Sequence, residues 1–308
     1  MNNKKKEQFF TNPKISDLLV RKITEFFSNS IYQRTIIEPS AGSGNFINSL
    51  INYGIKAENI LAYEIDKSFS KNKLLMIKDY LLEDIPYNEN NFIIGNPPFG
   101  KNGSLALKFL NKGLSESPYV ALILPMSFKK YSKHKHVLQG AQLLWEIDLP
   151  ENSFLVRNSQ YDVNCVFQLW SNPKVKSFLP NKRILQSPKL KVEDFITYTY
   201  NNTPKTLKFF NKDKYQWDLA IIRQGFYDYS KIITKESELS TNRQYIFIKI
   251  INPIALTILK QIDFNKLSQK NTIIPGFSKS DLITAYLHVK SNFKLKKKDT
   301  NLNFDQLR

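Results

Sequence analysis

The stretch that decides the fold lies near the N-terminus and reads Thr35-Ile36-Ile37-Glu38-Pro39-Ser40-Ala41-Gly42-Ser43-Gly44-Asn45-Phe46. Its apolar run ends at an acid and a proline, as a buried strand does where it leaves a sheet. Gly42 and Gly44 then allow the backbone to turn tightly and to come close to a ligand. Apolar residues recur at helical spacing from residue 47 to residue 51. The stretch therefore predicts a strand, a glycine-rich loop and a helix.

Glu38, at the end of this strand, indicates the charge of the ligand. A carboxylate would repel a phosphate group but favour a cationic group. The loop also lacks the lysine that follows the second glycine of a phosphate-binding loop, and it lacks the third glycine of the dinucleotide fingerprint. We therefore expect a ligand that presents a positive charge to this loop.

Three further predicted strands also carry polar side chains at their ends. They lie at residues 60–66, 76–81 and 91–95, and the side chains are Glu64, Asp79 and Asn96. Glu64 follows Glu38 at close to the offset of about 20 residues at which nucleotide-binding folds place a ribose-binding carboxylate. Strands alternate with helical patterns, which predicts an α/β fold with a doubly wound, Rossmann-like sheet. Ligands bind such sheets at the carboxyl ends of the strands, so we expect these four side chains at one site.

The rest of the first half supports the same fold. Asn12 followed by Pro13 predicts the start of a helix, as a cap and a first helical residue, with Thr11 just outside it. Later strands are predicted at residues 119–125, 143–149 and 161–170, and the last of these alternates like a strand with one exposed face. Phe154 is expected in the loop between the last two.

Charge divides the chain into two parts. The 308 residues contain 45 Lys and Arg and 27 Asp and Glu, a net charge of +18. Residues 1–172 hold 20 basic and 16 acidic residues, whereas residues 173–308 hold 25 basic and 11 acidic residues. We therefore predict a domain at 1–172 and a smaller basic domain at 173–308 that binds a polyanion.

The basic half also contains aromatic residues of the kind that stack on bases, next to a residue that contacts phosphates. They are Tyr215, Trp217, Arg223, Phe226, Tyr227 and Tyr229. A small aromatic core with a solvated basic rim would give the same pattern. The sequence leaves both interpretations open for each residue.

Several classes of protein are disfavoured. Cys165 is the only cysteine and there are three histidines, so we expect no disulfide and no metal site. No run approaches the ~20 apolar residues of a membrane span. Residues 1–6 lack the apolar region of a signal peptide. We expect a cytoplasmic protein that does not contact membranes.

The motifs and their order resemble one family. The Glu-Pro glycine loop at 38–44, Glu64, and Asn96-Pro97-Pro98-Phe99 are similar to those of the S-adenosylmethionine-dependent N6-adenine methyltransferases, with the motif order of the gamma group of DNA enzymes. The resemblance covers residues 9–170. It implies a methyltransferase catalytic domain, S-adenosylmethionine as cofactor and DNA as substrate.

The resemblance also implies which residues bind the cofactor. They are Thr11, Glu38, Pro39, Ala41, Gly42, Gly44, Glu64, Ile65, Asp79 and Asn96. Glu38 and the glycines would hold the methionine end, together with Thr11. Glu64 would hold the ribose, and Asp79 would hold the adenine amine of the cofactor.

The catalytic residues implied by the resemblance are Asn96, Pro97, Pro98 and Phe99. Asn96 and the Pro97 carbonyl would accept hydrogen bonds from the target amine, while Phe99 would stack on a base flipped out of its helix. Phe154 resembles a second aromatic residue that packs on the base.

Other substrates remain open. The same chemistry on RNA would use the same fold and motifs, because only contacts to the 2′-hydroxyl separate the two polymers. Glutamine methyltransferases that act on release factors use Asn-Pro-Pro-Tyr, where this chain has Phe99. The basic second half favours a nucleic acid over a protein substrate. A partner restriction endonuclease or second subunit is neither indicated nor excluded.

Overall fold

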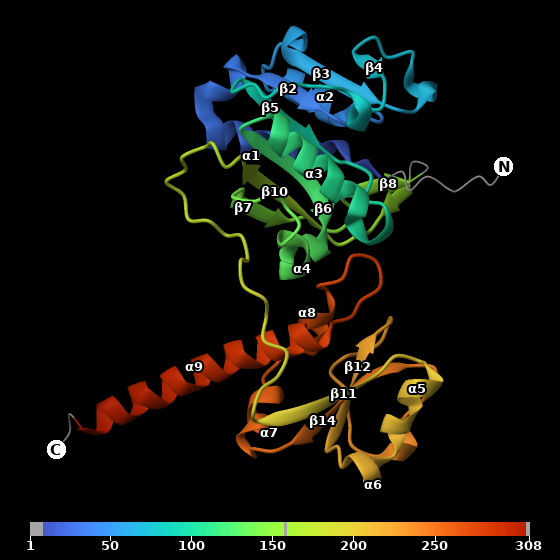
Figure 1. Cartoon of the computed structure of the whole chain (residues 1–308), viewed down its shortest axis with the longest axis vertical. Helices are drawn as coiled ribbons and strands as arrows, with labels where there is room; N and C mark the ends of the chain where they lie inside the picture. The colour runs from blue at the N-terminus through green and yellow to red at the C-terminus, as the bar shows by residue number, and fades with distance from the viewer. Residues whose placement is uncertain (1–8, 157–158, 306–308) are drawn as a thin grey trace. The chain divides into compact units, whose positions relative to one another are not determined.

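The structure is a computed structural model that describes residues 9–156 and 159–305. The chain divides into two compact units, Met1–Gln186 and Ser187–Arg308. A seven-stranded sheet forms the centre of the first unit, and a four-stranded sheet forms the centre of the second (Figure 1). Residues 1–6, whose sequence lacks the apolar region of a signal peptide, lie outside the described residues.

The sheet of the first unit has the strand order β4-β3-β2-β5-β6-β10-β7. Five strands run parallel: β2 (Thr35–Glu38), β3 (Ile60–Glu64), β4 (Leu75–Ile77), β5 (Asn91–Gly95) and β6 (Tyr119–Pro125). Two strands run antiparallel to their neighbours: β10 (Cys165–Ser171) and β7 (Gln142–Asp148). The predicted α/β fold with a doubly wound sheet is confirmed, and the sheet is mostly parallel.

Helices cover both faces of this sheet. They are α1 (Pro13–Phe27), α2 (Asn45–Asn52), α3 (Ser104–Glu116) and the short α4 (Tyr131–His134). The chain leaves β2 in one direction through α2 and leaves β5 in the other direction through α3. Because such crossovers are right-handed, α2 and α3 lie on opposite faces, and Figure 1 shows α3 on the near side. The ligand-binding edge of such a fold lies where the direction reverses, between β2 and β5.

The first helix begins where the sequence predicts. The Asn12 side chain accepts a hydrogen bond from the Lys14 backbone nitrogen at 3.1 Å, and Pro13 is the first helical residue. This cap fixes the position of Thr11 directly before the helix.

A second, small sheet in the first unit joins the N-terminal segment to residues 154–156 and 159–161. It contains β1 (Phe10–Thr11), β8 (Phe154–Val156) and β9 (Ser159–Tyr161), in the order β1-β8-β9. Thr11 is paired with Phe154 across this sheet. Phe154 was expected in a loop, and this expectation was wrong, because the residue begins a strand that pairs with the N-terminal segment.

The strand β10 corrects another prediction. All its residues are buried, whereas one exposed face was expected. The polar Gln168 is satisfied inside the protein, since its amide nitrogen donates to Glu146 at 2.8 Å and its oxygen accepts from Trp170 at 3.0 Å. In β10, which has a neighbouring strand on each side, the polar position of the alternating pattern therefore belongs to an internal hydrogen-bond network and not to an exposed face.

The first unit extends beyond residue 172, where we placed the domain boundary from the sequence. Arg183 anchors the segment after residue 172 to the rest of the first unit through its two terminal nitrogens. They donate at 2.8–2.9 Å to the backbone carbonyls of His134, Val137, Leu138 and Ala141. The Ile184 backbone nitrogen also donates to the His134 ring at 2.8 Å. These contacts explain why the compact units divide after Gln186.

The second unit is built on an antiparallel sheet in the order β11-β14-β12-β13. Its strands are β11 (Phe195–Tyr200), β12 (Leu219–Gln224), β13 (Ile232–Ile233) and β14 (Gln244–Ile250). Its helices are α5 (Pro204–Leu207), α6 (Lys212–Tyr215), α7 (Ile254–Leu259), α8 (Phe264–Ser268) and α9 (Lys279–Asp305). Aromatic residues fill much of its core, including Trp217, Phe247 and Tyr286.

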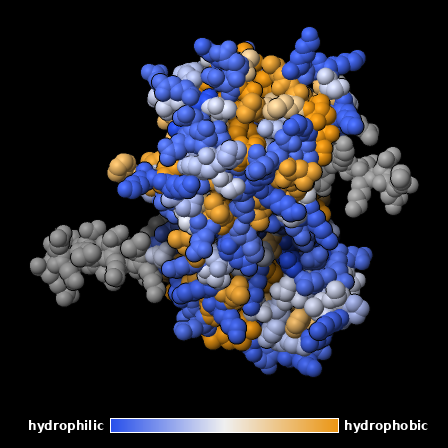
Figure 2. Space-filling view, turned by 45° about the horizontal axis from the view of Figure 1, so that its top comes forward, coloured by the Kyte–Doolittle hydropathy of each residue, from blue (hydrophilic) through white to orange (hydrophobic). Residues whose placement is uncertain are grey.

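Hydrophilic residues cover most of the surface visible in Figure 2, and apolar residues gather in smaller patches. Within residues 9–156 and 159–305, no helix is both long and apolar enough to cross a membrane.

The Arg183 contacts predict a measurable contribution to stability. Arg183→Met should lower the free energy of unfolding of the first unit by about 3 kcal/mol, because it removes charged hydrogen bonds to four carbonyls. Urea unfolding measures this change, with the neighbouring exposed Lys182→Met as control. Equal stability of the two variants would show that the segment is not held by this side chain.

Candidate functional site

A cavity of about 960 Å³ opens at the carboxyl ends of β2, β3, β4 and β5. Its volume lies at the upper end of the range of about 300–1,000 Å³ found for ligand sites. It brings together most of the site residues predicted from the sequence. Those that line it are Thr11, Glu38, Pro39, Ala41, Gly42, Glu64, Ile65, Asp79, Asn96, Pro97, Pro98 and Phe99. Gly44 and Phe154 do not line it.

The glycine loop forms one wall of the cavity. Gly42 and Gly44 both adopt left-handed backbone conformations, with φ of +52° and +81°. A Cβ atom on Gly42 would also come within 3.0 Å of the Phe10 ring, so this position has no room for a side chain. Gly44 instead precedes α2 and turns the chain into the helix. The two glycines therefore act differently, since only Gly42 reaches the cavity.

Glu64 links the end of β3 to the glycine loop. One carboxylate oxygen accepts from the Gly42 backbone nitrogen at 2.8 Å, and the other accepts from the Asp66 nitrogen at 2.7 Å. These bonds fix the carboxylate in the cavity wall. Each oxygen retains a lone pair with which it can accept a further hydrogen bond from a ligand hydroxyl.

Glu38 is a buried carboxyl group whose ionised form is destabilised. Its side chain is 1% exposed, and its Oε2 atom has no hydrogen-bond partner among the described residues. Burial raises the pKa of Glu38 to about 8, and the nearby Glu64 carboxylate contributes to this rise. A buried carboxylate without a partner is costly, so the site favours a ligand that supplies a cationic hydrogen-bond donor here.

The turn after β5 presents Asn96 in a fixed orientation. The Asn96 side-chain nitrogen donates to the Phe9 carbonyl at 2.8 Å, which directs the amide oxygen away from that carbonyl. The Ser40 hydroxyl donates to the Asn96 carbonyl at 3.0 Å and ties the turn to the glycine loop. The sequence carries no signal for the contribution of Phe9, because this residue acts through a backbone carbonyl that any residue could supply.

Phe99 is fixed by its own backbone. The Phe99 carbonyl accepts from the nitrogens of Leu105 and Ala106 at the start of α3, at 3.1 and 3.2 Å. Its ring lines the cavity with its centroid 6.2 Å from that of Phe9. The turn therefore combines an oriented amide with an aromatic wall.

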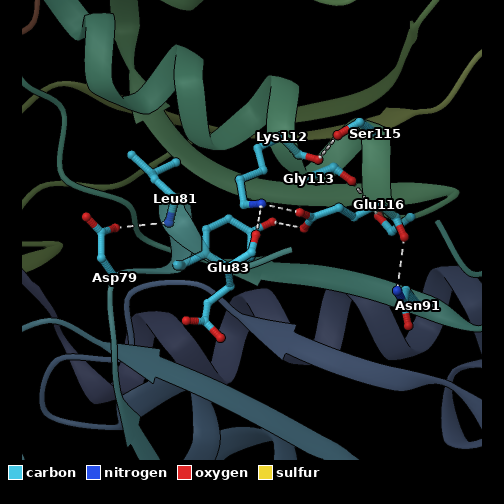
Figure 3. A network of polar contacts seen from close by, with 10 residues as sticks. Asp79, Leu81, Glu83, Asn91, Lys112, Gly113, Ser115 and Glu116 are labelled. Atoms are coloured by element: carbon cyan, nitrogen blue, oxygen red, sulfur yellow. Dashed lines mark hydrogen bonds and ion pairs between the residues drawn. The ribbon is translucent and has the colours of Figure 1, made fainter. Parts of the chain in front are cut away.

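The segment that carries Asp79 rests on a buried polar network (Figure 3). Asp79 caps the short 3-10 helix Tyr80–Leu82 by accepting from the Leu81 nitrogen at 3.0 Å. The Tyr80 hydroxyl donates to Glu116 of α3 at 2.5 Å, and Lys112 pairs with the other oxygen of Glu116 at 2.5 Å. Burial and the Glu116 charge both raise the pKa of Tyr80, which keeps its hydroxyl protonated. The network holds Asp79 at the cavity; Tyr80 carries no sequence signal for this role.

Phe154 lies apart from the cavity lining. It is fully buried, and its ring packs edge-on against Phe9 with 6.2 Å between centroids. Tyr161, on the neighbouring strand β9, also contacts Phe9, stacking on its ring at 5.4 Å and 15°, and is 41% exposed. Of these two aromatic residues, only Tyr161 offers its ring to solvent.

The described residues contain no group of three or more His, Cys, Asp or Glu side chains arranged to hold a metal ion. The polar groups that line the cavity are mainly carboxylates, amides, hydroxyls and backbone atoms. These groups can bind a cation and hydroxyl groups and can accept hydrogen bonds from an amine.

Comparison with known proteins gives partial similarities. No family model matches the chain. A curated relative, ribosomal RNA small subunit methyltransferase A of Mycoplasmopsis pulmonis, is 31% identical over 114 residues. The match covers 34% of this chain, and the chain spans 43% of the length of that relative.

The solved structures that match part of this chain have low sequence identity to it. The methyltransferase subunit of a type I restriction-modification system from Streptococcus thermophilus is 18% identical, with a TM-score of 0.41 over 54% of this chain and 45% of its own. The type IIL restriction-modification enzyme MmeI, solved in complex with DNA, is 11% identical, with a TM-score of 0.47 over 91% of this chain and 67% of its own.

The raised pKa of Glu38 predicts a pH dependence of stability. In the unfolded chain this carboxyl ionises near pH 4.5, whereas in the folded protein it holds its proton until about pH 8. The folded state therefore binds more protons between these values, and stability falls as pH rises. Glu38→Gln lacks this titration. From pH 5 to pH 8, the wild type should lose on the order of 4 kcal/mol relative to the variant.

Urea unfolding of the ligand-free protein at several pH values tests this expectation. Glu58→Gln, at an exposed position, serves as the control and should follow the wild type. Parallel curves for the wild type and Glu38→Gln would mean that the Glu38 carboxyl is solvated or has a partner in solution.

Proposed function

We propose that the chain transfers a methyl group from S-adenosylmethionine to the N6 amine of adenine in DNA. The observation that carries this proposal is the meeting of Glu38 and Asn96 in one cavity. A buried carboxyl group with an oxygen unpartnered among the described residues lines the same cavity as an amide that is held with its oxygen directed away from the Phe9 carbonyl, where it can accept from an amine. Such a site suits one ligand with an ammonium group and a second ligand with an exocyclic amine.

The cavity residues fit S-adenosylmethionine. The Glu38 carboxylate would pair with the ammonium group of its methionine end, near Thr11 and the glycine loop. Glu64 would accept from the ribose hydroxyls, and Asp79 would accept from the adenine amine. The remaining contacts would come from Pro39, Ala41, Gly42 and Ile65. Gly44 does not line the cavity and would act only by turning the chain into α2. When bound, this cofactor supplies an electrophilic methyl group.

Asn96 and the Pro97 carbonyl would activate the target amine. An adenine amine is a weak nucleophile because its lone pair is shared with the ring. Two acceptors on its hydrogens favour a tetrahedral nitrogen, whose lone pair can then point at the methyl group. The proton can leave after attack, so the site needs no histidine. Pro97 and Pro98 stiffen the turn that carries both acceptors.

The target base must leave its helix to reach this cavity. Unstacking a base costs a few kcal/mol, and stacking on Phe99 would offset part of that cost. Tyr161 is a better placed second aromatic residue than Phe154, because it is exposed and stacks on Phe9 beside Phe99.

The charge of the second half supports a nucleic acid as substrate. Residues 173–308 carry 25 basic and 11 acidic residues, and neutralisation of phosphates rewards such an excess. RNA is the second candidate, favoured by the name of the curated relative, which is a ribosomal RNA methyltransferase. Glutamine methylation of protein is disfavoured by the same charge.

Two substitutions separate the proposed roles. Asn96→Ala should lower the rate of methyl transfer by about 10²–10³-fold, the loss expected on removal of one preorganised contact to the reacting group. It should leave the dissociation constant of S-adenosylmethionine nearly unchanged. Glu64→Ala should raise that constant about tenfold, because a charged acceptor is lost. Transfer of a labelled methyl group and calorimetry measure the two quantities; the reverse pattern would contradict the assigned roles.

Salt dependence tests the class of substrate. Binding of a DNA oligonucleotide by the full chain should weaken at least about tenfold between 50 and 200 mM salt, because each phosphate contact releases counterions. Fluorescence anisotropy measures the dissociation constant at each salt concentration. A flat response would favour a protein substrate.

A further inference from the structure

The six aromatic and basic residues of the second unit that the sequence analysis names fall into a buried group and a surface group. Trp217 and Tyr229 are buried in the core, with 0% and 1% exposure. Tyr215 packs against Tyr198 and Phe209, at 5.1 and 5.0 Å between ring centroids. These three residues therefore hold the unit together.

The other three residues reach the surface. Phe226 is 77% exposed and Tyr227 is 39% exposed, whereas Arg223 is half-buried. An apolar ring as exposed as that of Phe226 contributes little to the core and is available for contact with a ligand.

These surface residues lie at one end of the four-stranded sheet. Gln224, at the end of β12, pairs with Gln244, at the start of β14. The register shifts at Arg223, between Ile222 and Gln224. A bulge of this kind redirects a side chain. Arg243 immediately precedes β14, and Asn201 immediately follows β11. The end of the sheet therefore gathers two guanidinium groups next to the loop that carries the two aromatic rings.

Contacts among these residues fix both guanidinium groups. The Arg223 Nη1 atom donates to the Asn201 side chain at 2.5 Å. The Arg243 guanidinium lies over the Tyr227 ring, 4.8 Å from its centroid. Both groups are held at the surface, although neither has a carboxylate partner in a described ion pair.

The loop that carries Phe226 is also rigid. The Gly225 nitrogen donates to the Pro275 carbonyl at 3.0 Å, and the Tyr229 hydroxyl lies 2.6 and 2.7 Å from the carbonyls of Gly225 and Pro275. Gly225 has a φ of +123°, and a Cβ atom there would collide with the Tyr227 ring. Only glycine fits this position.

Asp228, the acidic residue of the loop, stabilises the loop through hydrogen bonds. Its Oδ1 atom accepts from the Ser230 nitrogen and hydroxyl at 2.9 and 2.7 Å. It also accepts from Asn265 at 3.3 Å. These bonds fix the backbone on both sides of Phe226.

We propose that Phe226, Tyr227, Arg223 and Arg243 form a surface that binds an unpaired stretch of the DNA substrate. A base stacks on the Phe226 ring, and the two guanidinium groups contact the neighbouring phosphates. The base is unpaired because the Phe226 ring, on the protein surface, can stack fully only on a base that no longer stacks on its neighbours in a duplex. This inference rests on the proposed function, since it names how the second unit holds the same substrate.

Binding of a fluorescent single-stranded DNA oligonucleotide to the full chain tests the stacking contact. Phe226→Ala should weaken binding roughly tenfold, as expected for loss of one stacked base, and Phe226→Trp should retain binding. Phe178→Ala removes an exposed phenylalanine of the first unit and should bind like the wild type. A duplex of the same sequence should respond less to Phe226→Ala.

The salt dependence of binding tests the phosphate contacts. Arg243→Gln should reduce the slope of log binding constant against log salt by roughly 0.7, the share of one phosphate of a single strand. Lys260→Gln is the matched control and should leave the slope unchanged, because Lys260 lines a pocket together with Ile250, which lies at the opposite end of β14 from Arg243.

The outcomes separate this inference from the proposed function. If the wild type methylates DNA and Phe226→Ala binds single-stranded DNA as the wild type does, the surface is wrong. If the Phe226 dependence is found with RNA of the same sequence but not with DNA, the assignment to DNA is wrong. Absence of methyl transfer by the wild type to DNA and RNA, with Phe226-dependent binding retained, would overturn the proposed function alone.

Discussion

The parallel pairing of β2 with β5 brings the two halves of the site together. Ile36 and Ile37 pair with Phe92 and Ile93, so the glycine loop and the turn at Asn96 leave the sheet side by side. Gly95 leaves room for this approach, since a Cβ atom there would come within 3.3 Å of Pro39. The Ser40 hydroxyl then bonds the Asn96 carbonyl across the gap. Every other site residue is positioned relative to this pair of strands.

The composition of the cavity follows from that arrangement. Strand ends supply Glu38, Glu64 and Asn96, which are fixed by the sheet, and the N-terminal segment closes the site through the Phe9 carbonyl. Burial makes the carboxylate at the centre costly until a cation meets it. The ionised form of Glu38 is therefore destabilised at a position where a cationic ligand would stabilise it, an arrangement that is common in functional sites.

The sequence predicted the sheet and the meeting of its polar strand ends, because apolar runs and glycine loops act locally and parallel strands end at a common edge. It did not predict the pairing of Thr11 with Phe154, because two such short strands from distant segments leave no periodic signal. The interior place of Gln168 was also missed, since a polar residue looks the same in sequence whether water or Glu146 satisfies it. Among the aromatic residues of the second unit, the sequence could not separate the buried Trp217 from the exposed Phe226.

The most direct test of the account identifies the methylated product. The full chain is incubated with labelled S-adenosylmethionine and, in parallel, with DNA, RNA and protein, and the nucleosides and amino acids are then analysed by mass spectrometry. The account predicts that the label appears in N6-methyladenine released from DNA. Label in glutamine, in cytosine or at another position of adenine would contradict it.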